Sequence, residues 1–280
     1  MTTWKIWLEE ATLRLRISLS SSPRLDAKIL LENVTGASRS HLITFDEFVL
    51  TDLQKSKLES LLVRRELGEP IAYITKKREF WSLPLTVSTD TLIPRPDTEC
   101  LVQCALNLLP FMELKVLDLG TGSGAIALAL ASERPEWKII GIDCIPGAIL
   151  IARANADHLK LNNVKFYEGN WFQFLKNQRY DLIVSNPPYI KSNDAILVQG
   201  NLRFEPRKAL EAGEDGLKHL KIICNEAGSH LQSGGWLILE HACCQGEIVR
   251  SLLRSGGFSK ITTIKDYSNN DRVSQGQWLR

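Results

Sequence analysis

The chain of 280 residues lacks an apolar run long enough to cross a membrane, and its beginning lacks the apolar core of a secretion signal. A membrane-spanning helix needs about 20 consecutive apolar residues, whereas charged side chains recur between Lys5 and Arg16. The chain also lacks a marked excess of positive charge: 34 Lys and Arg against 32 Asp and Glu leave a net charge of +2, and no basic stripe stands out in the sequence. Proteins dedicated to a polyanion usually concentrate positive charge on one face. We therefore expect neither membrane association nor direct nucleic-acid binding.

Metal-binding and disulfide patterns are absent as well. The six cysteines show no Cys-x-x-Cys spacing, and the five histidines are scattered without paired ligand spacing. A chain of this length can bury a sizeable core without disulfides. We predict reduced thiols, no metal ion and a cytoplasmic protein. There are no internal repeats, and the 44% hydrophobic content is that of an ordinary globular protein.

The first part of the chain has the apolar spacing of helices. One predicted helix covers the start of the chain, a second follows Pro23, and a third runs from Asp52 to Leu67 with Thr51 as its N-cap. From Arg78 to Val87 the apolar residues alternate as in strands. We therefore predict a helical domain over residues 1–77 and a β-hairpin linker over residues 78–90. The apolar residues of the first helix are Trp4, Trp7, Leu8, Ala11 and Leu15.

Residues 91–280 read as a separate α/β domain. Short β-rich runs alternate with helical runs, which is typical of a parallel sheet covered on both faces. The last two strands are predicted to form an antiparallel pair after a helix over Gln245–Leu253. The predicted strands are Val116–Leu119, Ile139–Ile142, Val164–Tyr167, Leu182–Val184, Leu237–Leu239, Ile261–Ile264 and Val273–Leu279. The other predicted helices are Ala125–Ala131, Ala148–Leu159 and Leu217–Leu231.

A glycine-rich turn follows the first of these strands. Asp118 to Gly124 reads Asp-Leu-Gly-Thr-Gly-Ser-Gly and leads into a helix. Glycines let backbone N–H groups approach a ligand, and open α/β sheets bind ligands at this end of their strands. Asp143, at the end of the next strand, is placed to accept hydrogen bonds from a ribose diol. The loop alone does not separate a nicotinamide dinucleotide from S-adenosylmethionine.

The run Asn186-Pro187-Pro188-Tyr189 closes the fourth strand and decides between them. An amide or aromatic amine is a weak nucleophile, so an enzyme that methylates it must fix the NH₂ group and stabilise the positive charge that develops on nitrogen. The Asn186 side-chain oxygen and the Pro187 carbonyl can each accept one N–H. Tyr189 offers a flat face for a planar group. A plain turn is the alternative, but a nicotinamide enzyme has no use for this arrangement, so we favour methyl transfer.

Several further motifs accompany these two segments. They are Ile93-Pro94-Arg95-Pro96-Asp97-Thr98-Glu99, Phe204-Glu205-Pro206 with Ala209-Leu210, Leu239-Glu240-His241 and Asp271-Arg272. With them, residues 78–280, and more loosely the helical region before them, resemble the PrmC/HemK release-factor glutamine methyltransferases. The Asn-Pro-Pro-Tyr run occurs in other methyltransferases too, whereas Ile-Pro-Arg-Pro is much more specific. His241 itself is expected to be a packed, hydrogen-bonded histidine.

The resemblance implies a seven-stranded Rossmann-like class I methyltransferase domain. It implies S-adenosylmethionine as cofactor, S-adenosylhomocysteine as product, and the glutamine of the Gly-Gly-Gln motif of bacterial peptide chain release factors as substrate. The N-terminal helical domain would grip the release factor, and Arg95 to Glu99 would form a flap. We expect a monomer. Implied cofactor residues are Gly120, Thr121, Gly122, Ser123, Gly124, Asp143, Trp171 against the adenine, and Asn186; implied substrate residues are Asn186, Pro187, Pro188 and Tyr189.

Two positions depart from the family pattern. Asn170 stands where an Asp is usual, so the adenine amine meets an uncharged acceptor, and Asp97 replaces a common Glu. Two other readings stay open. An exocyclic base amine of DNA or RNA could be methylated by the same chemistry, although the charge balance argues against it. A binding protein that lost catalysis is the second, although the complete Asn186–Tyr189 run argues against it.

Overall fold

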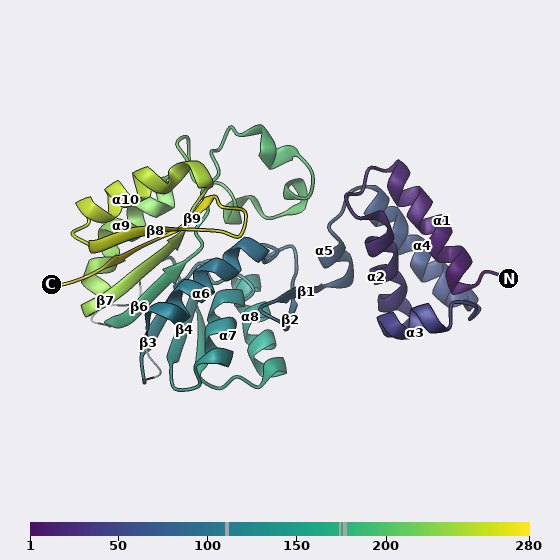
Figure 1. Ribbon diagram of the computed structural model, residues 1–280, viewed down its shortest axis with the longest axis horizontal. Helices are drawn as coiled ribbons and strands as arrows, with labels where there is room; N and C mark the ends of the chain where they lie inside the picture. Colours follow the sequence, from purple (N-terminus) through teal and green to yellow (C-terminus); the bar gives the residue numbers. More distant parts are fainter. Residues whose placement is uncertain (110–111, 174, 176–177) are drawn as a thin grey trace. The chain divides into compact units, whose positions relative to one another are not determined.

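A computed structural model describes residues 1–109, 112–173, 175 and 178–280. The chain divides into two compact units (Figure 1). The first, the helical unit, contains Met1–Lys77 together with Gln199–Phe204; the second, the sheet unit, contains Arg78–Val198 and Glu205–Arg280. Within the described residues, no helix is both long and apolar enough to span a bilayer.

The helical unit is built around α1 (Trp4–Ile17), α2 (Pro23–Thr35) and α4 (Asp52–Glu66), which confirms the three predicted helices. The Thr51 hydroxyl accepts from the Gln54 backbone N–H, and the Gln54 side chain accepts from the Thr51 N–H. This capping box satisfies two backbone donors that the helix start leaves free. Two short helices, α3 (Arg39–Thr44) and α5 (Ile71–Thr75), were not predicted. They are too short for apolar periodicity to reveal.

The hairpin consists of β1 (Lys77–Phe80) and β2 (Leu83–Thr86). Its two turn residues, Trp81 and Ser82, both have positive φ, 53° and 58°. A two-residue turn of this kind follows the twist of the paired strands, although it usually uses Asn and Gly. The Trp81 N–H donates to Glu99 (2.9 Å) and its indole N–H donates to Glu133 (2.8 Å), so two carboxylates hold the turn.

Seven strands form the sheet of the second unit, in the order β5-β4-β3-β6-β7-β9-β8. Strands β3 to β7 are parallel, and β9 runs antiparallel to both β7 and β8. The predicted parallel sheet and its antiparallel closing pair are therefore confirmed. The strand bounds are β3 (Lys115–Leu119), β4 (Lys138–Asp143), β5 (Val164–Glu168), β6 (Tyr180–Ser185), β7 (Leu231–Glu240), β8 (Ser259–Lys265) and β9 (Asp271–Gln277).

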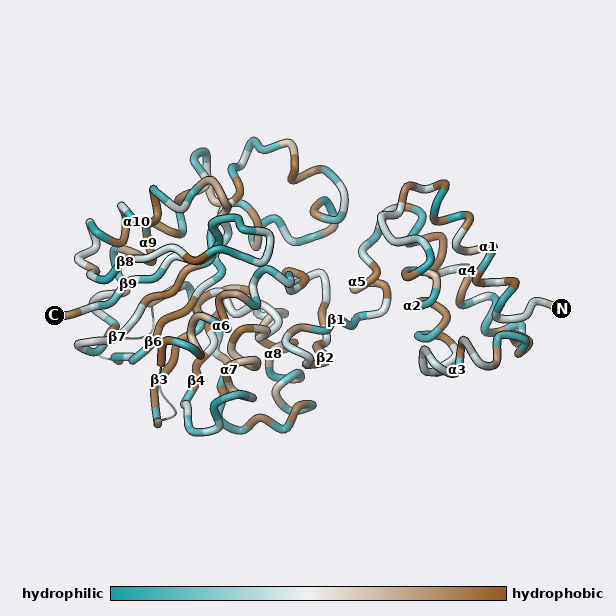
Figure 2. The backbone as a smooth tube through the Cα atoms, in the orientation of Figure 1, coloured by the Kyte–Doolittle hydropathy of each residue, from teal (hydrophilic) through white to brown (hydrophobic). Residues whose placement is uncertain are grey.

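Helices cover both faces of this sheet (Figure 1). On one face lie α6 (Glu99–Leu108), α7 (Ala125–Glu133) and α8 (Pro146–Leu159), and on the other lie α9 (Lys218–Glu226) and α10 (Gly246–Ser255). Strand side chains alternate between the two cores, so that Val116 packs on the first face and Leu117 on the second. Figure 2 shows the resulting apolar character of the central strands.

One predicted helix, Leu217–Leu231, is wrong at its end. Helix α9 stops at Glu226, a 3₁₀ turn covers Ala227–His230, and Leu231 begins β7. Leu231 continues the helical spacing of Leu220 and Ala227, so periodicity alone cannot separate it from the helix. Strand β7 is also longer than the predicted Leu237–Leu239. The prediction missed its first part because Gln232 and Ser233, which follow Leu231, are polar and exposed. Helix α6 was not assigned from the sequence.

Candidate functional site

A cavity of about 650 Å³ opens at the carboxyl ends of the parallel strands, within the sheet unit. This is the edge at which open α/β sheets bind ligands. The glycine loop and the Asn-Pro-Pro-Tyr turn both line it, although they are far apart in the sequence. Of the predicted site residues, the cavity is lined by Gly120, Thr121, Gly122, Ser123, Asp143, Trp171, Asn186 and Pro188, whereas Gly124, Pro187 and Tyr189 are not part of its lining.

The glycine loop connects β3 to α7 and depends on left-handed backbone at three positions. Gly120, Gly122 and Gly124 have φ of 72°, 56° and 84°. A Cβ on Gly122 would meet no atom within 4 Å, whereas one on Gly124 would lie 3.0 Å from the Phe166 ring and from Leu128. Gly124 thus allows α7 to pack close to the sheet, and Gly122 leaves open space beside the loop. Such open backbone is where a ligand can approach closely.

Asp143 ends β4 and holds the loop from the neighbouring strand. Its carboxylate accepts from the Gly122 N–H and the Ile145 N–H, both at 2.9 Å. Burial raises the pKa of Asp143, while these backbone hydrogen bonds lower it. Each carboxylate oxygen has a second lone pair, so the group can still accept from a bound hydroxyl. The structure therefore adds a loop-holding contact to the ribose contact predicted from the sequence.

Trp171 lies beside the loop in a left-handed conformation, with φ of 48°. Its ring is the nearest group to a Cβ built on Gly120, at 3.6 Å, and its centroid is 5.3 Å from the His219 ring. Asn170, the departure from the family pattern, also lines the cavity, and so does His219. The indole thus supplies a flat apolar wall on the side of Gly120.

The Asn-Pro-Pro-Tyr turn follows β6, whose last residue, Ser185, donates to the Leu119 carbonyl at 2.7 Å and so links the ends of β6 and β3. Asn186 donates from its side-chain nitrogen to the Thr98 hydroxyl oxygen at 3.1 Å. Pro187 is buried, and the Tyr189 hydroxyl donates to Glu240 at 3.3 Å. Burial raises the pKa of Tyr189 well above its usual range, so the phenol stays protonated.

The segment expected to form a flap comprises a 3₁₀ turn, Pro96–Thr98, and the first residue of α6. Pro94, Arg95 and Thr98 line the cavity. Glu205 has a fully buried side chain that accepts from the Ile93 N–H (3.1 Å) and pairs with Arg95. Glu205, 110 positions after Arg95 in the sequence, therefore anchors this segment.

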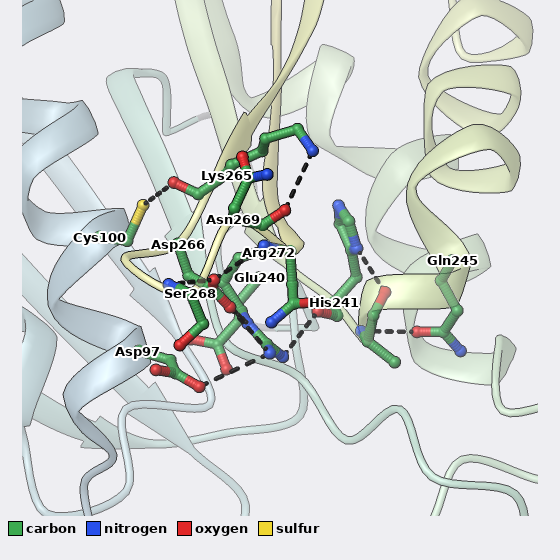
Figure 3. A network of polar contacts seen from close by, with 12 residues as sticks. Asp97, Cys100, Glu240, His241, Gln245, Lys265, Asp266, Ser268, Asn269 and Arg272 are labelled. Atoms are coloured by element: carbon green, nitrogen blue, oxygen red, sulfur yellow. Dashed lines mark hydrogen bonds and ion pairs between the residues drawn. The ribbon is translucent and has the colours of Figure 1, made fainter.

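A network of charged residues behind the turn carried no role in the sequence analysis. Arg272 on β9 contacts Asp266 at 3.1 Å and Asp97 at 3.5 Å (Figure 3). Glu240, at the end of β7, is buried, and its pKa is raised to about 7 by that burial. In the sequence, Glu240 and Arg272 were marked only as members of two family motifs, with no role assigned to either. His241 is packed as expected, with ring contacts to Ser274 (2.8 Å) and the Ala242 carbonyl (2.9 Å).

Two buried carboxyl groups predict that stability falls as pH rises. Burial raises the pKa of Asp118 and of Glu240 to about 7. Unfolded carboxyl groups are ionised above about pH 5, so between pH 6.5 and 8 only the folded state loses protons from these groups. These two groups should lower the free energy of unfolding by about 1.5 kcal/mol over this window. His219 and His241, whose pKa burial lowers, oppose this fall at the lower end of the window, because unfolded imidazoles still release protons there.

Urea unfolding at pH 6.5, 7.2 and 8.0 measures this slope. Glu240→Gln and Asp118→Asn should each remove about half of the carboxyl contribution, because each replaces one titrating group with a neutral side chain of similar shape. A slope that both variants leave intact would show that other groups cause the pH dependence.

Comparison with known proteins identifies the family of both parts of the chain. Residues 111–274 match the methyltransferase domain family, and residues 7–75 match the PrmC N-terminal domain family. The release factor glutamine methyltransferase of Salmonella typhimurium is 52% identical over 97% of this chain and 98% of the relative. The Escherichia coli enzyme of the same name is 50% identical over 98% of both chains, and the Vibrio cholerae enzyme is 50% identical over 97% of this chain and 95% of its own.

Among solved structures, a methyltransferase from Pyrococcus furiosus superposes with a TM-score of 0.56 at 18% identity, covering 79% of this chain and all of the other. That likeness concerns the fold and confirms the Rossmann-like methyltransferase architecture. Because the curated relatives match at about half of all positions over nearly the full length of both chains, the chain belongs to the release factor glutamine methyltransferase family.

Proposed function

We propose that this protein transfers a methyl group from S-adenosylmethionine to the side-chain amide nitrogen of the glutamine in the Gly-Gly-Gln motif of bacterial peptide chain release factors. The observation that carries the proposal is the single cavity lined by both the glycine loop and the Asn186 turn. The names of the relatives support the substrate. Since translation termination takes place in the cytoplasm, we place the protein there.

The cavity fits the cofactor on three observations. Gly120 and Gly122 present left-handed backbone with open space at Gly122, Asp143 offers carboxylate oxygens at its edge, and Trp171 forms a flat wall. These would hold the amino-acid chain, the ribose hydroxyls and the adenine respectively. When bound, the cofactor supplies an electrophilic methyl group on a sulfonium. S-adenosylhomocysteine is the product, and this chemistry needs no metal ion.

Two acceptors would fix the substrate NH₂. The Asn186 side-chain nitrogen is tied to Thr98, so its oxygen is left to accept one substrate N–H. The Pro187 carbonyl would accept the other. Fixed acceptors stabilise the charge that grows on nitrogen during transfer, and Pro188 and Tyr189 would flank the planar amide. One chain contains both segments, so we propose that a monomer suffices.

To test this, the purified protein is incubated with S-adenosylmethionine that carries a labelled methyl group, and with release factor, total RNA or DNA as the methyl acceptor. We expect label on the release factor, and mass spectrometry should place one methyl on the Gly-Gly-Gln glutamine. A release factor with Gln changed to Ala in that motif is the matched control and should stay unlabelled. Label on nucleic acid alone would contradict the substrate assignment and favour an amino-methyltransferase acting on an exocyclic base amine.

For the helical domain over residues 1–77, we propose a role in gripping the release factor. Phe45, Phe48 and Val49 follow α3 and are about half exposed. Rings of His41, Phe45 and Phe48 lie within 5.9 Å of one another. Exposed apolar clusters of this kind commonly mark protein-binding surfaces.

Replacing Phe45 and Phe48 together by serine should raise the KM for the release factor about tenfold. The expected loss follows from the contact area of two aromatic side chains, and kcat and cofactor affinity should not change, because the cavity belongs to the sheet unit. Leu279→Ser, which also removes an exposed apolar side chain, serves as control. An unchanged KM in the double variant would remove this surface from the proposal.

A further inference from the structure

The end of β7 lies beside the Asn186 turn because β6 and β7 are neighbouring parallel strands. Their register pairs Ser185 with Leu239, so the next residues along each strand, Asn186 and Glu240, come to the same edge of the sheet. Thr98 approaches this edge from the 3₁₀ turn before α6. Three segments that are far apart in the sequence therefore meet behind the substrate-binding turn.

Hydrogen bonds tie both polar side chains of the turn to buried partners. The Asn186 side-chain N–H donates to the Thr98 oxygen at 3.1 Å, and the Tyr189 hydroxyl donates to Glu240 Oε1 at 3.3 Å. The Thr98 hydroxyl in turn lowers the pKa of Glu240, which is the effect of a donor that faces the carboxylate. Glu240 is 1% exposed, and Thr98 is 4% exposed.

We infer that Thr98 and Glu240 are positioning residues for methyl transfer: through these hydrogen bonds they fix the orientation of the Asn186 amide and of the Tyr189 ring. The inference rests on the proposed function, since it concerns how the same turn presents its acceptor to the substrate. Neither residue contacts the reacting atoms in this scheme.

The single hydrogen of the Thr98 hydroxyl decides which way the Asn186 amide faces. An asparagine amide carries a donor and an acceptor of nearly equal size, and only its partners decide which way it faces. With its hydrogen directed at Glu240, which it faces, the Thr98 oxygen is left to accept, and it accepts from the Asn186 nitrogen. The Asn186 oxygen then faces the other way, toward a substrate N–H. With no acceptor behind Thr98, its hydroxyl could donate to the Asn186 oxygen. The Asn186 NH₂ group would then face the NH₂ group of the substrate amide, and neither could accept from the other.

Charges around Glu240 support its role as an acceptor. Arg272 on β9 faces it and favours the ionised form, whereas Asp97, before α6, disfavours it. Tyr189 faces it from the turn after β6, Asp266 binds Arg272 from the β8–β9 connection, and Cys100 lies on α6 nearby. A buried carboxylate costs stability unless it is hydrogen-bonded and paired. Among the described residues, Oε1 of Glu240 accepts from Tyr189 and Oε2 has no hydrogen-bond partner, so the Thr98 hydroxyl that faces the group is a donor available to it.

Thr98→Val tests the inference because valine keeps the shape and removes the hydroxyl. We expect kcat for the release factor to fall at least tenfold with cofactor affinity unchanged, and Thr98→Ser to restore most of it. Thr262→Val, at an exposed position of β8, is the matched control. In an Asn186→Ala background, Thr98→Val should have no further effect, since Thr98 acts through Asn186. Unchanged kcat in Thr98→Val, or an equal loss in both backgrounds, would overturn the inference.

Glu240→Gln gives a second measurement that does not depend on the Thr98 variant folding well. The wild type should show kcat rising as Glu240 ionises between about pH 6 and 8, and Glu240→Gln should lack this rise while binding the cofactor as before. An identical pH profile would overturn the role of Glu240. Failure of the wild type to label the release factor would instead count against the proposed function, so the two failures are distinguishable.

Discussion

Asn186→Ala is expected to lower kcat for the release factor at least 100-fold. The side-chain oxygen that disappears would accept a hydrogen bond from a nitrogen that gains positive charge in the transition state. Removing one such fixed electrostatic partner typically costs about 10²–10³ in kcat, or roughly 3–4 kcal/mol. Thr98 already holds the Asn186 nitrogen, so the Asn186 oxygen is oriented before the substrate binds. A water molecule that fills the space left by alanine would have no such fixed orientation. Single-turnover kinetics with saturating cofactor measures the chemical step directly.

The control for this variant is Asn162→Ala, at an exposed position before β5. Calorimetry should show that Asn186→Ala binds S-adenosylmethionine nearly as tightly as wild type, because the lost contact is to the methyl acceptor. A variant that keeps wild-type turnover would remove Asn186 from the mechanism. A variant that loses only cofactor affinity would move the residue to the cofactor side of the cavity.

The parts of the fold that follow from local pattern could be predicted from the sequence. The glycine loop and the Asn-Pro-Pro-Tyr turn each follow a short apolar strand, and parallel strands bring their carboxyl ends to one edge. That rule was sufficient to expect both segments in one cavity, where the structure places them. The N-cap Thr51 could also be predicted, because the start of a helix is specified by about four consecutive residues.

The rest depends on long-range pairing that no local spacing encodes. Thr98 and Asn186 are 88 positions apart, and Arg95 and Glu205 are 110 apart. Only the strand order brings β7 beside β6 and so places Glu240 behind the turn. The misassigned end of α9 has a related cause, because Leu231 suits a helix by its spacing and belongs to a strand by its tertiary contacts. Asp143 was expected at the cavity from its position in the sequence, but its hydrogen bond to Gly122 was not.

Asp143→Ala is expected to weaken S-adenosylmethionine binding at least 100-fold. Two effects add. The carboxylate would lose hydrogen bonds to ribose hydroxyls, and hydrogen bonds to a charged group are worth about 1.5–3 kcal/mol each. The Gly122 N–H would also lose its partner at 2.9 Å, so the loop that should meet the cofactor would no longer be held in its left-handed conformation. Calorimetric titration with S-adenosylhomocysteine measures the affinity without turnover.

A cofactor analogue separates the two effects. With S-adenosylhomocysteine lacking its ribose hydroxyls, wild type should already bind weakly, and Asp143→Ala should lose only the part that comes from the loosened loop. Asp143→Asn is the intermediate case, because the amide keeps one acceptor oxygen for the Gly122 N–H but loses the charge. Relative to Asp143→Ala, it should regain the affinity that comes from the ordered loop, and less of the affinity that comes from the ribose hydroxyls. Equal losses for both ligands would assign Asp143 to the loop alone. Since its carboxylate already accepts from two backbone N–H groups, the ribose would then be recognised by other groups lining the cavity.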